Sequence, residues 1–374
     1  LGHNVLSRYA PGVRLIVSGW GGDRWMGFSD FYLGLDKTLP PDVVFAALDN
    51  IDPTAAPAVS HAYGEVSPGR ERWPIPWFES DGGGTRRDQW GPQCNVLPFT
   101  ALCRDALAKG SQGLLGIHWR SRGVEEVAAY VSEFAWDPQL SYDEFYDRFA
   151  RRCFGPEIGP ELSRVLCDLE ALGPRWTGSH GQVECGSFWW FAGDERPLPE
   201  NLQKLSAIEE RLVALRARCP VESVDRLDYL LHMLRWVTKY DAAALKLLPG
   251  GPVETAIAQA EAARASASAD RVDRARAAYT ALVSAGLGEA FNECAQLLTT
   301  RGDLGVLATA NGKAYAAYRE LQRRVAALAD SPWPAEDTHV RSLQLSVPVT
   351  PDRLLPGENL ELGAIARTPH APAQ

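Results

Sequence analysis

The chain has 374 residues, of which 45% are hydrophobic and 23% charged, and its net charge is −9. This length allows two domains with a sizeable core, and the composition is that of an ordinary globular protein. The acidic balance and the lack of a Lys/Arg-rich run argue against a nucleic-acid partner. No apolar stretch approaches the ~20 residues that a membrane-spanning helix needs, so we expect no membrane partner.

The cysteines give no sign of a disulfide framework or a zinc site. There are seven, they are scattered, and none belongs to a Cys-x-x-Cys pair. This usage favours free thiols in a reducing compartment and slightly favours the cytoplasm. The seven histidines are also dispersed without metal-ligand spacing. We therefore expect neither a metal nor a cofactor.

The first 135 residues alternate strand and helix patterns. Apolar, near-continuous runs predict buried strands, and helical patterns over 28–39 and 96–109 lie between some of them. The predicted strands cover residues 13–20, 43–49, 72–81 and 114–120. Buried strands that alternate with helices predict βα units and a parallel sheet.

Polar and aromatic residues follow each predicted strand at its C-terminal end. They are Trp20 and Asp23, Asp49 and Asp52, Glu79 and Asp81, and His118 to Arg122. A (β/α)₈ barrel keeps its active site at this edge, although an open doubly wound sheet uses the same strand ends. No Gly-x-Gly-x-x-Gly follows a strand, which argues against a dinucleotide-binding sheet.

Four βα units make only half of a (β/α)₈ barrel. Half a barrel leaves two unpaired sheet edges, which invite association into a homo-oligomer or with a partner half. We therefore expect this chain to be the C-terminal part of a longer enzyme, or to have its partner half elsewhere.

The pattern becomes helical after residue 135. Ser141-Tyr142-Asp143-Glu144 is a capping-box signature, and the alanine-rich segment 256–278 predicts one long, partly exposed helix. The aromatic run Phe188–Phe191 lies in an irregular segment, where it either packs as a plug or faces a sugar. Helices are predicted over 157–172, 200–218, 222–247, 253–284, 287–299 and 303–329.

The predicted fold class is therefore α/β followed by all-α. Residues 1–135 would form the C-terminal half of a (β/α)₈ barrel, and residues 136–332 a helical domain. Residues 333–374 contain period-two patterns over 340–347 and 360–362, which predict a short β tail or the start of a truncated β-domain.

The candidate catalytic groups are carboxylates at consecutive strand ends. In an extended strand Glu79 and Asp81 share one face, and Asp49 ends the preceding strand. A glycosidase needs one protonated and one ionised carboxyl group, and a dry pocket separates the pKa values of two neighbouring carboxyls. Glu79 is the first candidate, Asp49 the second and Asp81 the third. For Asp49, a structural role with Asn50 as a helix N-cap or turn is as well supported as a catalytic role. For Glu79 and Asp81, the structural alternative is a pair of solvated acids at the end of a strand.

Aromatic and basic residues near these acids are candidates for binding a sugar. Tryptophan offers a flat apolar face to sugar C–H groups, and arginine can hold a carboxylate with two hydrogen bonds. Packing of the tryptophans at the rim, and a pairing of Arg120 with Glu79 or Asp81, are the structural alternatives. The candidates are Trp20, Asp23, Trp73, Trp77, Trp90, His118, Trp119 and Arg120.

Several strand-end motifs resemble those of a known group of enzymes. They are Trp20-Gly21-Gly22-Asp23, Leu48-Asp49, Pro76-Trp77-Phe78-Glu79-Ser80-Asp81-Gly82, Gly116-Ile117-His118-Trp119-Arg120, Ala135-Trp136-Asp137-Pro138 and Phe154-Gly155. Together they resemble (β/α)₈ exo-glycosidases with a C-terminal helical domain. The arrangement is similar to glycoside hydrolase families 67 (α-glucuronidases), 20 and 84 (hexosaminidases), over residues 13–330.

The resemblance implies a glycoside hydrolase that removes a terminal sugar. Under the family 67 resemblance, Asp49 and Glu79 would be the candidate base carboxylates of an inverting enzyme, and the general acid would come from an earlier strand. Under the hexosaminidase resemblance, Glu79 and Asp81 would bind substrate and the catalytic pair would lie on an earlier strand. The alternative function is a non-catalytic carbohydrate-binding or scaffold protein. A lyase or aldolase is disfavoured, because no lysine lies at a strand end.

Overall fold

The computed structural model describes residues 2–19, 33–49, 59–76, 78, 96–118, 122–172 and 199–299, together with 304, 307, 314 and 318–328. The chain divides into two units, which are considered separately below. The first contains residues 1–89 and 93–174, and the second contains residues 90–92 and 175–374. The domain limits expected from the sequence fall at other positions and stay predictions.

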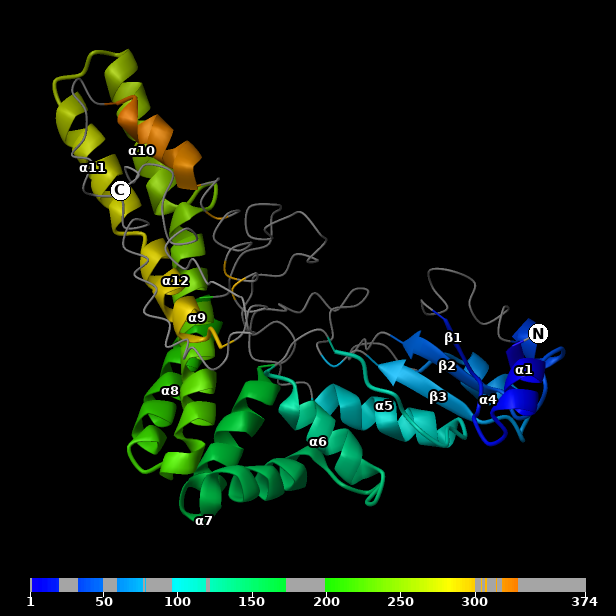
Figure 1. Cartoon of the computed structure of the whole chain (residues 1–374). Helices are drawn as coiled ribbons and strands as arrows, with labels where there is room; N and C mark the ends of the chain where they lie inside the picture. Colours follow the sequence, from blue (N-terminus) through cyan, green and yellow to red (C-terminus); the bar gives the residue numbers. More distant parts are fainter. Residues whose placement is uncertain are drawn as a thin grey trace, which may run out of the picture. The chain divides into compact units, whose positions relative to one another are not determined.

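The first unit contains a parallel sheet in which the strands follow one another in chain order (Figure 1). Strand β1 (Ile16–Gly19) pairs with β2 (Val44–Asp49), and β2 pairs with β3 (Arg72–Pro76). The apolar residues at the start of β2 are fully buried, as expected for a central parallel strand. The prediction of parallel βα strands in this part of the chain is confirmed.

Residues 114–117 extend the sheet beyond β3. The amide of Leu115 donates to the carbonyl of Pro74, and that of Ile117 donates to Pro76, both at 3.0 Å. Phe78 N–H then donates to the Ile117 carbonyl at 3.0 Å, which gives a parallel ladder. Among the described residues the sheet is open, with β1 and segment 114–117 at its edges, so the barrel stays a prediction.

The helices of the first unit are α1 (Gly2–Tyr9), α4 (Ala62–Glu65), α5 (Val96–Ala108), α6 (Glu125–Phe134) and α7 (Tyr142–Ala171). The predicted helix over 96–109 is confirmed as α5, and the described part of the predicted helix over 28–39 is helical at 33–36. The predicted capping box is present, because Ser141 accepts from the amide of Glu144 while the Glu144 side chain reaches back.

Helix α7 breaks at Gly155, whose backbone has φ 83° and ψ 164°. Only glycine adopts this conformation readily, and Pro156 follows at the first position of the next helical segment. The predicted helix over 157–172 is therefore the second segment of α7.

The second unit is helical. Its elements are α8 (Pro199–Arg216), the short 3₁₀ helix η3 (Val221–Ser223), α9 (Val224–Leu247), α10 (Pro252–Ala265), α11 (Arg271–Val283) and α12 (Leu287–Gln296). Helix α9 packs against α8 and α12, and α10 packs against α11. The predicted helices over 200–218, 222–247 and 287–299 are confirmed as α8, α9 and α12.

The prediction of one long helix over 253–284 is wrong. Helices α10 and α11 are separate and pack side by side (Figure 1). Between them Ala267 has a positive φ of 52°, and the Ser268 hydroxyl bonds to Asp270. The high helix propensity of alanine is compatible with a continuous helix. However, the helical hairpin formed by α10 and α11 buries the apolar stripes of both helices against each other.

None of the helices described in the structure is both long and apolar enough to cross a membrane. Residues 173–198, which include Phe188–Phe191, lie outside the described part of the chain. The same is true of residues 329–374, so the predicted β tail stays a prediction.

Candidate functional site

The C-terminal edge of the parallel sheet carries the candidate site. Asp49 is the last residue of β2, and its backbone is in register with Pro76, the last residue of β3. Because all strands run in the same direction, their C-terminal ends at Asp49, Pro76 and Ile117 lie at one edge of the sheet.

Most of the predicted site residues lie outside the described part of the chain, and their roles stay predictions. Asp49 is described only by its backbone. The residues outside are Trp20, Asp23, Trp77, Glu79, Asp81, Trp90, Trp119 and Arg120. The predicted residues whose side chains are described are Trp73 and His118.

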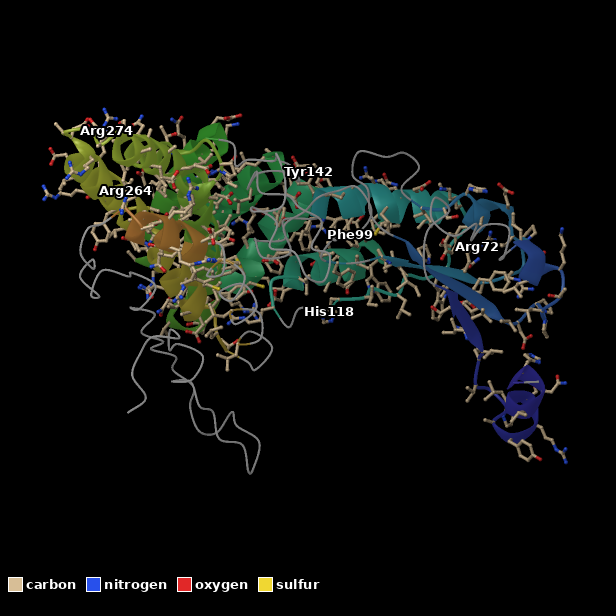
Figure 2. The ribbon with its side chains drawn as sticks, turned by 90° about the horizontal axis from the view of Figure 1, so that it is seen from above. Arg72, Phe99, His118, Tyr142, Arg264 and Arg274 are labelled. Carbon is tan, nitrogen blue, oxygen red and sulfur yellow. The ribbon has the colours of Figure 1, made fainter. Side chains whose placement is uncertain are left out.

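His118 lies at the described end of the fourth strand segment, where it is exposed. Its ring is stacked on Phe78, with the ring centroids 6.3 Å apart and the planes 7° from parallel. Phe78 in turn meets Phe99 of α5 edge to face, at a centroid distance of 5.4 Å. Figure 2 shows His118 and Phe99 in this part of the molecule. Phe78, which is 7% exposed, thus connects the exposed imidazole to the buried packing under α5.

Gly116 makes this stack sterically feasible. A Cβ atom built on Gly116 would lie 2.0 Å from the Phe78 ring, well inside any real contact distance. The ring of Phe78 therefore lies directly over the backbone of the fourth strand segment. The sequence showed Gly116 before His118 and Phe78 before Glu79, but nothing in it indicated that the two segments touch.

Trp73 lies at the opposite end of β3 from the predicted acids. Its indole Nε1 donates to Glu71 at 2.9 Å, and the Arg14 guanidinium lies over the ring at 5.3 Å. Arg14 and Glu71 also pair with each other. A Cβ atom on Gly113 would lie 2.8 Å from the Trp73 indole, so this ring lies against the segment that leads into the fourth strand.

Trp73 and His118 also lie on opposite faces of the sheet. Trp73 packs with Ala46, Ile75 and Ile117, whereas His118 stacks on Phe78, which contacts α5. The alternation of side chains along a strand separates neighbours such as Ile117 and His118 in this way. The structure therefore does not bring these two predicted sugar-binding residues together.

Arg70 is a buried residue that sequence reasoning missed, and it fixes the start of β2. It is 2% exposed and donates to the carbonyls of Leu39 and Pro40 at 2.9 Å and of Val43 at 2.8 Å. Its guanidinium lies 4.3 Å from the centre of the Phe45 ring. These contacts hold the strand that ends at Asp49. A single arginine after a Pro-Gly turn gave no sequence signal for this role.

Asp36 is the ionic partner of Arg70. Burial alone would raise the pKa of Asp36, but hydrogen bonds from Arg70 and Ser67 outweigh it and lower that pKa. The Asp36 carboxylate is therefore ionised at neutral pH. Within the described residues, no group of three or more His, Cys, Asp or Glu side chains could hold a metal ion.

No family model and no curated protein matches this chain. Among solved structures, the chain is similar to a family GH115 4-O-methyl-α-glucuronidase with specificity for decorated arabinogalactans, with a TM-score of 0.48 and 13% identity. The similarity covers 66% of this chain and 34% of that enzyme, so the chain spans about a third of the enzyme's length. That enzyme belongs to family 115 and not to families 67, 20 or 84, which the sequence resembled.

Proposed function

We propose that this chain carries the catalytic or sugar-binding edge of a glycoside hydrolase that removes a terminal sugar from an oligosaccharide. The observation that supports the proposal is the parallel register of β2 and β3, in which Asp49 lies beside Pro76. Glu79 follows Pro76 by three residues and Asp81 by five. The predicted carboxylates therefore belong to segments that begin at neighbouring points of one sheet edge.

In this proposal Glu79 acts as a catalytic carboxylate, with Asp49 or Asp81 as its partner. One of the two carboxyl groups protonates the leaving oxygen. The other either activates a water molecule or attacks the anomeric carbon. Carboxyl groups ~6.5–9.5 Å apart would give inversion of the anomeric centre, and groups ~5–5.5 Å apart would give retention. The anomer released first, identified by proton NMR, distinguishes these outcomes.

The sugar contacts in this proposal come from the tryptophans and basic residues at the same edge. His118 is exposed at this edge and held by its stack on Phe78, which supports a role as a hydrogen-bonding contact. Trp73 has the least support among the candidates, because Glu71, Arg14 and Gly113 surround its ring at the start of β3. Trp20, Trp77, Trp90, Trp119, Asp23 and Arg120 complete the proposed set.

The test is hydrolysis of aryl glycosides by the chain and by its Glu79→Gln variant. The panel includes glucuronides and N-acetylhexosaminides. Glu65→Gln is the matched control, because Glu65 is an exposed carboxylate on α4. We expect turnover of at least one glycoside, a loss of ~100-fold or more in Glu79→Gln, and no change in Glu65→Gln.

Turnover that survives in Glu79→Gln would remove Glu79 from the chemistry and leave it as a binding residue. Absence of turnover on every glycoside, combined with retained binding of a sugar by calorimetry, would replace the proposal with the carbohydrate-binding alternative. Asp49→Asn and Asp81→Asn, measured on the same substrate, identify the partner carboxylate.

A further inference from the structure

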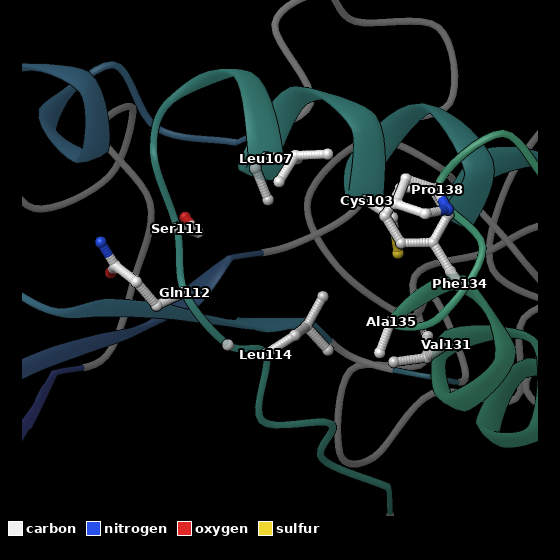
Figure 3. A pocket seen from close by; sticks show the side chains of 11 residues that line it. Cys103, Leu107, Ser111, Gln112, Leu114, Val131, Phe134, Ala135 and Pro138 are labelled. Carbon is white, nitrogen blue, oxygen red and sulfur yellow. The ribbon is translucent and has the colours of Figure 1, made fainter.

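A hollow lies away from the proposed sugar site, at the opposite end of the sheet. It has a volume of about 180 Å³ and lies between the C-terminal half of α5, the end of α6 and the segment that leads into the fourth strand (Figure 3). Its lining is Cys103, Ala106, Leu107, Ser111, Gln112, Gly113, Leu114, Val131, Phe134, Ala135 and Pro138. No charged side chain is in this set.

The end of α5 fixes the position of Ser111 in this hollow. The amide of Ser111 donates to the Ala106 carbonyl at 2.9 Å, and the amide of Gly110 donates to Leu107 at 2.9 Å. Gly110 has a φ of 75°, so these bonds form a Schellman motif with Gly110 in the left-handed position. Ser111 is therefore held by the helix cap and not by its own side chain.

The Ser111 hydroxyl is buried and has no hydrogen-bond partner among the described residues. Burial of an unsatisfied hydroxyl is unfavourable, so a ligand group that forms a hydrogen bond with it would be favoured. Gln112 does not supply that group, because its Oε1 accepts from the Arg72 amide at 3.0 Å and its side chain points away from the hollow (Figure 3).

The remaining side chains of the wall carry no charge, and most of them are apolar. Leu114, Val131 and Phe134 contribute hydrocarbon, and burial raises the pKa of the Cys103 thiol to about 12, so that it stays neutral. Leu107, which is 52% exposed, and the exposed residues Ala135 and Pro138 border the hollow and leave a path from solvent. A cavity of ~150 Å³ lined by apolar side chains is large enough to hold benzene.

We propose that this hollow binds a small, neutral aromatic alcohol, with its ring between α5 and α6 and its hydroxyl hydrogen-bonded to Ser111 Oγ. A free sugar is a poor fit, because it brings many hydroxyls and only one buried side-chain atom of the wall, Ser111 Oγ, lacks a hydrogen-bond partner among the described residues. A carboxylate or an amine is disfavoured, because no opposite charge lines the hollow.

The experiment is fluorine NMR titration of the chain with 4-fluorobenzyl alcohol and with 4-fluorotoluene, which lacks the hydroxyl. We expect the alcohol to bind more tightly. Ser111→Ala should weaken binding of the alcohol about fivefold, the equivalent of one neutral hydrogen bond, and leave binding of fluorotoluene unchanged. Ser132→Ala, on the outer side of α6 with its hydroxyl bonded to Ala128, is the matched control.

Two variants that fill the hollow test its location. Ala106→Leu and Ala135→Leu should each weaken binding of both probes at least tenfold. Because Ala135 is exposed, its replacement preserves the fold. Fluorine-to-proton NOEs to the methyl groups of Leu114 and Val131 locate the probe in the unaltered chain. The proposal would be overturned if the alcohol did not bind, or if its NOEs came from other residues only. It would also be overturned if the alcohol bound Ser111→Ala as tightly as it binds the unaltered chain.

Discussion

Glu170, near the end of α7, caps the start of α5 by accepting from the backbone amide of Val96 at 2.6 Å. The same carboxylate oxygen accepts from the Tyr146 hydroxyl at 2.8 Å, and the Glu170 side chain is almost fully buried. A carboxylate at a helix N-terminus satisfies free amides and interacts favourably with the helix dipole. This contact spans 74 residues of sequence, and it ties α7 to the βα part of the first unit.

Glu170→Ala should destabilise the first unit by about 2 kcal/mol, because it leaves the Val96 amide and the Tyr146 hydroxyl buried without this acceptor. Urea unfolding followed by far-ultraviolet circular dichroism measures the change. Asp147→Ala removes an exposed carboxylate of α7 that pairs with Arg151, and it should cost about 0.5 kcal/mol or less. Equal losses for the two variants would show that the cap does not stabilise the unit.

Gly116→Ala should destabilise the chain by about 1–3 kcal/mol, because the added methyl group overlaps the Phe78 ring and displaces it. The displaced ring would also lose its stack with His118. If the proposed function holds, the variant should then also lose activity beyond what its stability explains. Thermal unfolding and glycoside turnover are measured on the same preparations.

Gly69→Ala is the control for this prediction. A Cβ atom on Gly69 would meet nothing within 4 Å, and Gly69 lies in a turn with an ordinary φ. We expect a change within about 0.5 kcal/mol. A Gly116→Ala variant as stable as Gly69→Ala would contradict the close packing of Phe78 on the fourth strand segment.

The parallel strands were predictable because their signal is local. Runs such as Val44 to Leu48 are apolar at every position, as a strand buried on both faces requires. The capping box at Ser141 was predictable for the same reason, since its bonds span three residues. These features depend on near neighbours in the sequence.

Contacts between distant segments were not predictable from the pattern. Arg70 binds carbonyls about thirty residues earlier in the chain, and Glu170 binds Val96 from 74 residues away. Neither residue stands in a motif. The separation of Trp73 from His118 was missed because their residue types suggested a shared role in binding a sugar. The alternation of side chains along each strand decides which face of the sheet a residue occupies, and its place along the strand decides which edge it lies near.

Ala267→Gly should stabilise the second unit by about 1 kcal/mol. Ala267 has a φ of 52°, a conformation that costs an L-residue with a Cβ atom about 1–2 kcal/mol and costs glycine little. The greater flexibility of glycine in the unfolded chain offsets part of the gain. The measurement is the urea midpoint of unfolding.

Ala265→Gly, two residues earlier at the end of α10, should have the opposite sign. Ala265 is still in the helix, where glycine costs up to about 1 kcal/mol relative to alanine. Loss of stability in both variants would contradict the left-handed turn at Ala267 and would favour the continuous helix that the alanine-rich sequence suggested.

The second unit should lose stability in acid through Glu293 of α12. Its carboxylate accepts from Lys239 at 2.6 Å and bonds to the His232 ring at 2.9 Å, two turns apart on α9. Burial alone would raise the pKa of Glu293, but these bonds outweigh it and lower the pKa from 4.5 to about 2. Since the folded pKa is the lower one, the stabilisation is present above pH 4.5 and is lost as the pH falls towards 2.

Glu293→Gln should therefore lower the free energy of unfolding by roughly 2 kcal/mol at pH 6, and by progressively less as the pH falls from 4.5 towards 2. The measurement is urea unfolding at a series of pH values, followed by circular dichroism. Glu289→Gln, at an exposed position one turn earlier on α12, should leave the whole profile parallel to that of the unaltered chain. If Glu293→Gln and the unaltered chain lose stability in acid with the same slope, the ion pairs between α9 and α12 do not set the acid response. Such a constant difference between the two profiles would assign the loss of stability to packing of the altered side chain.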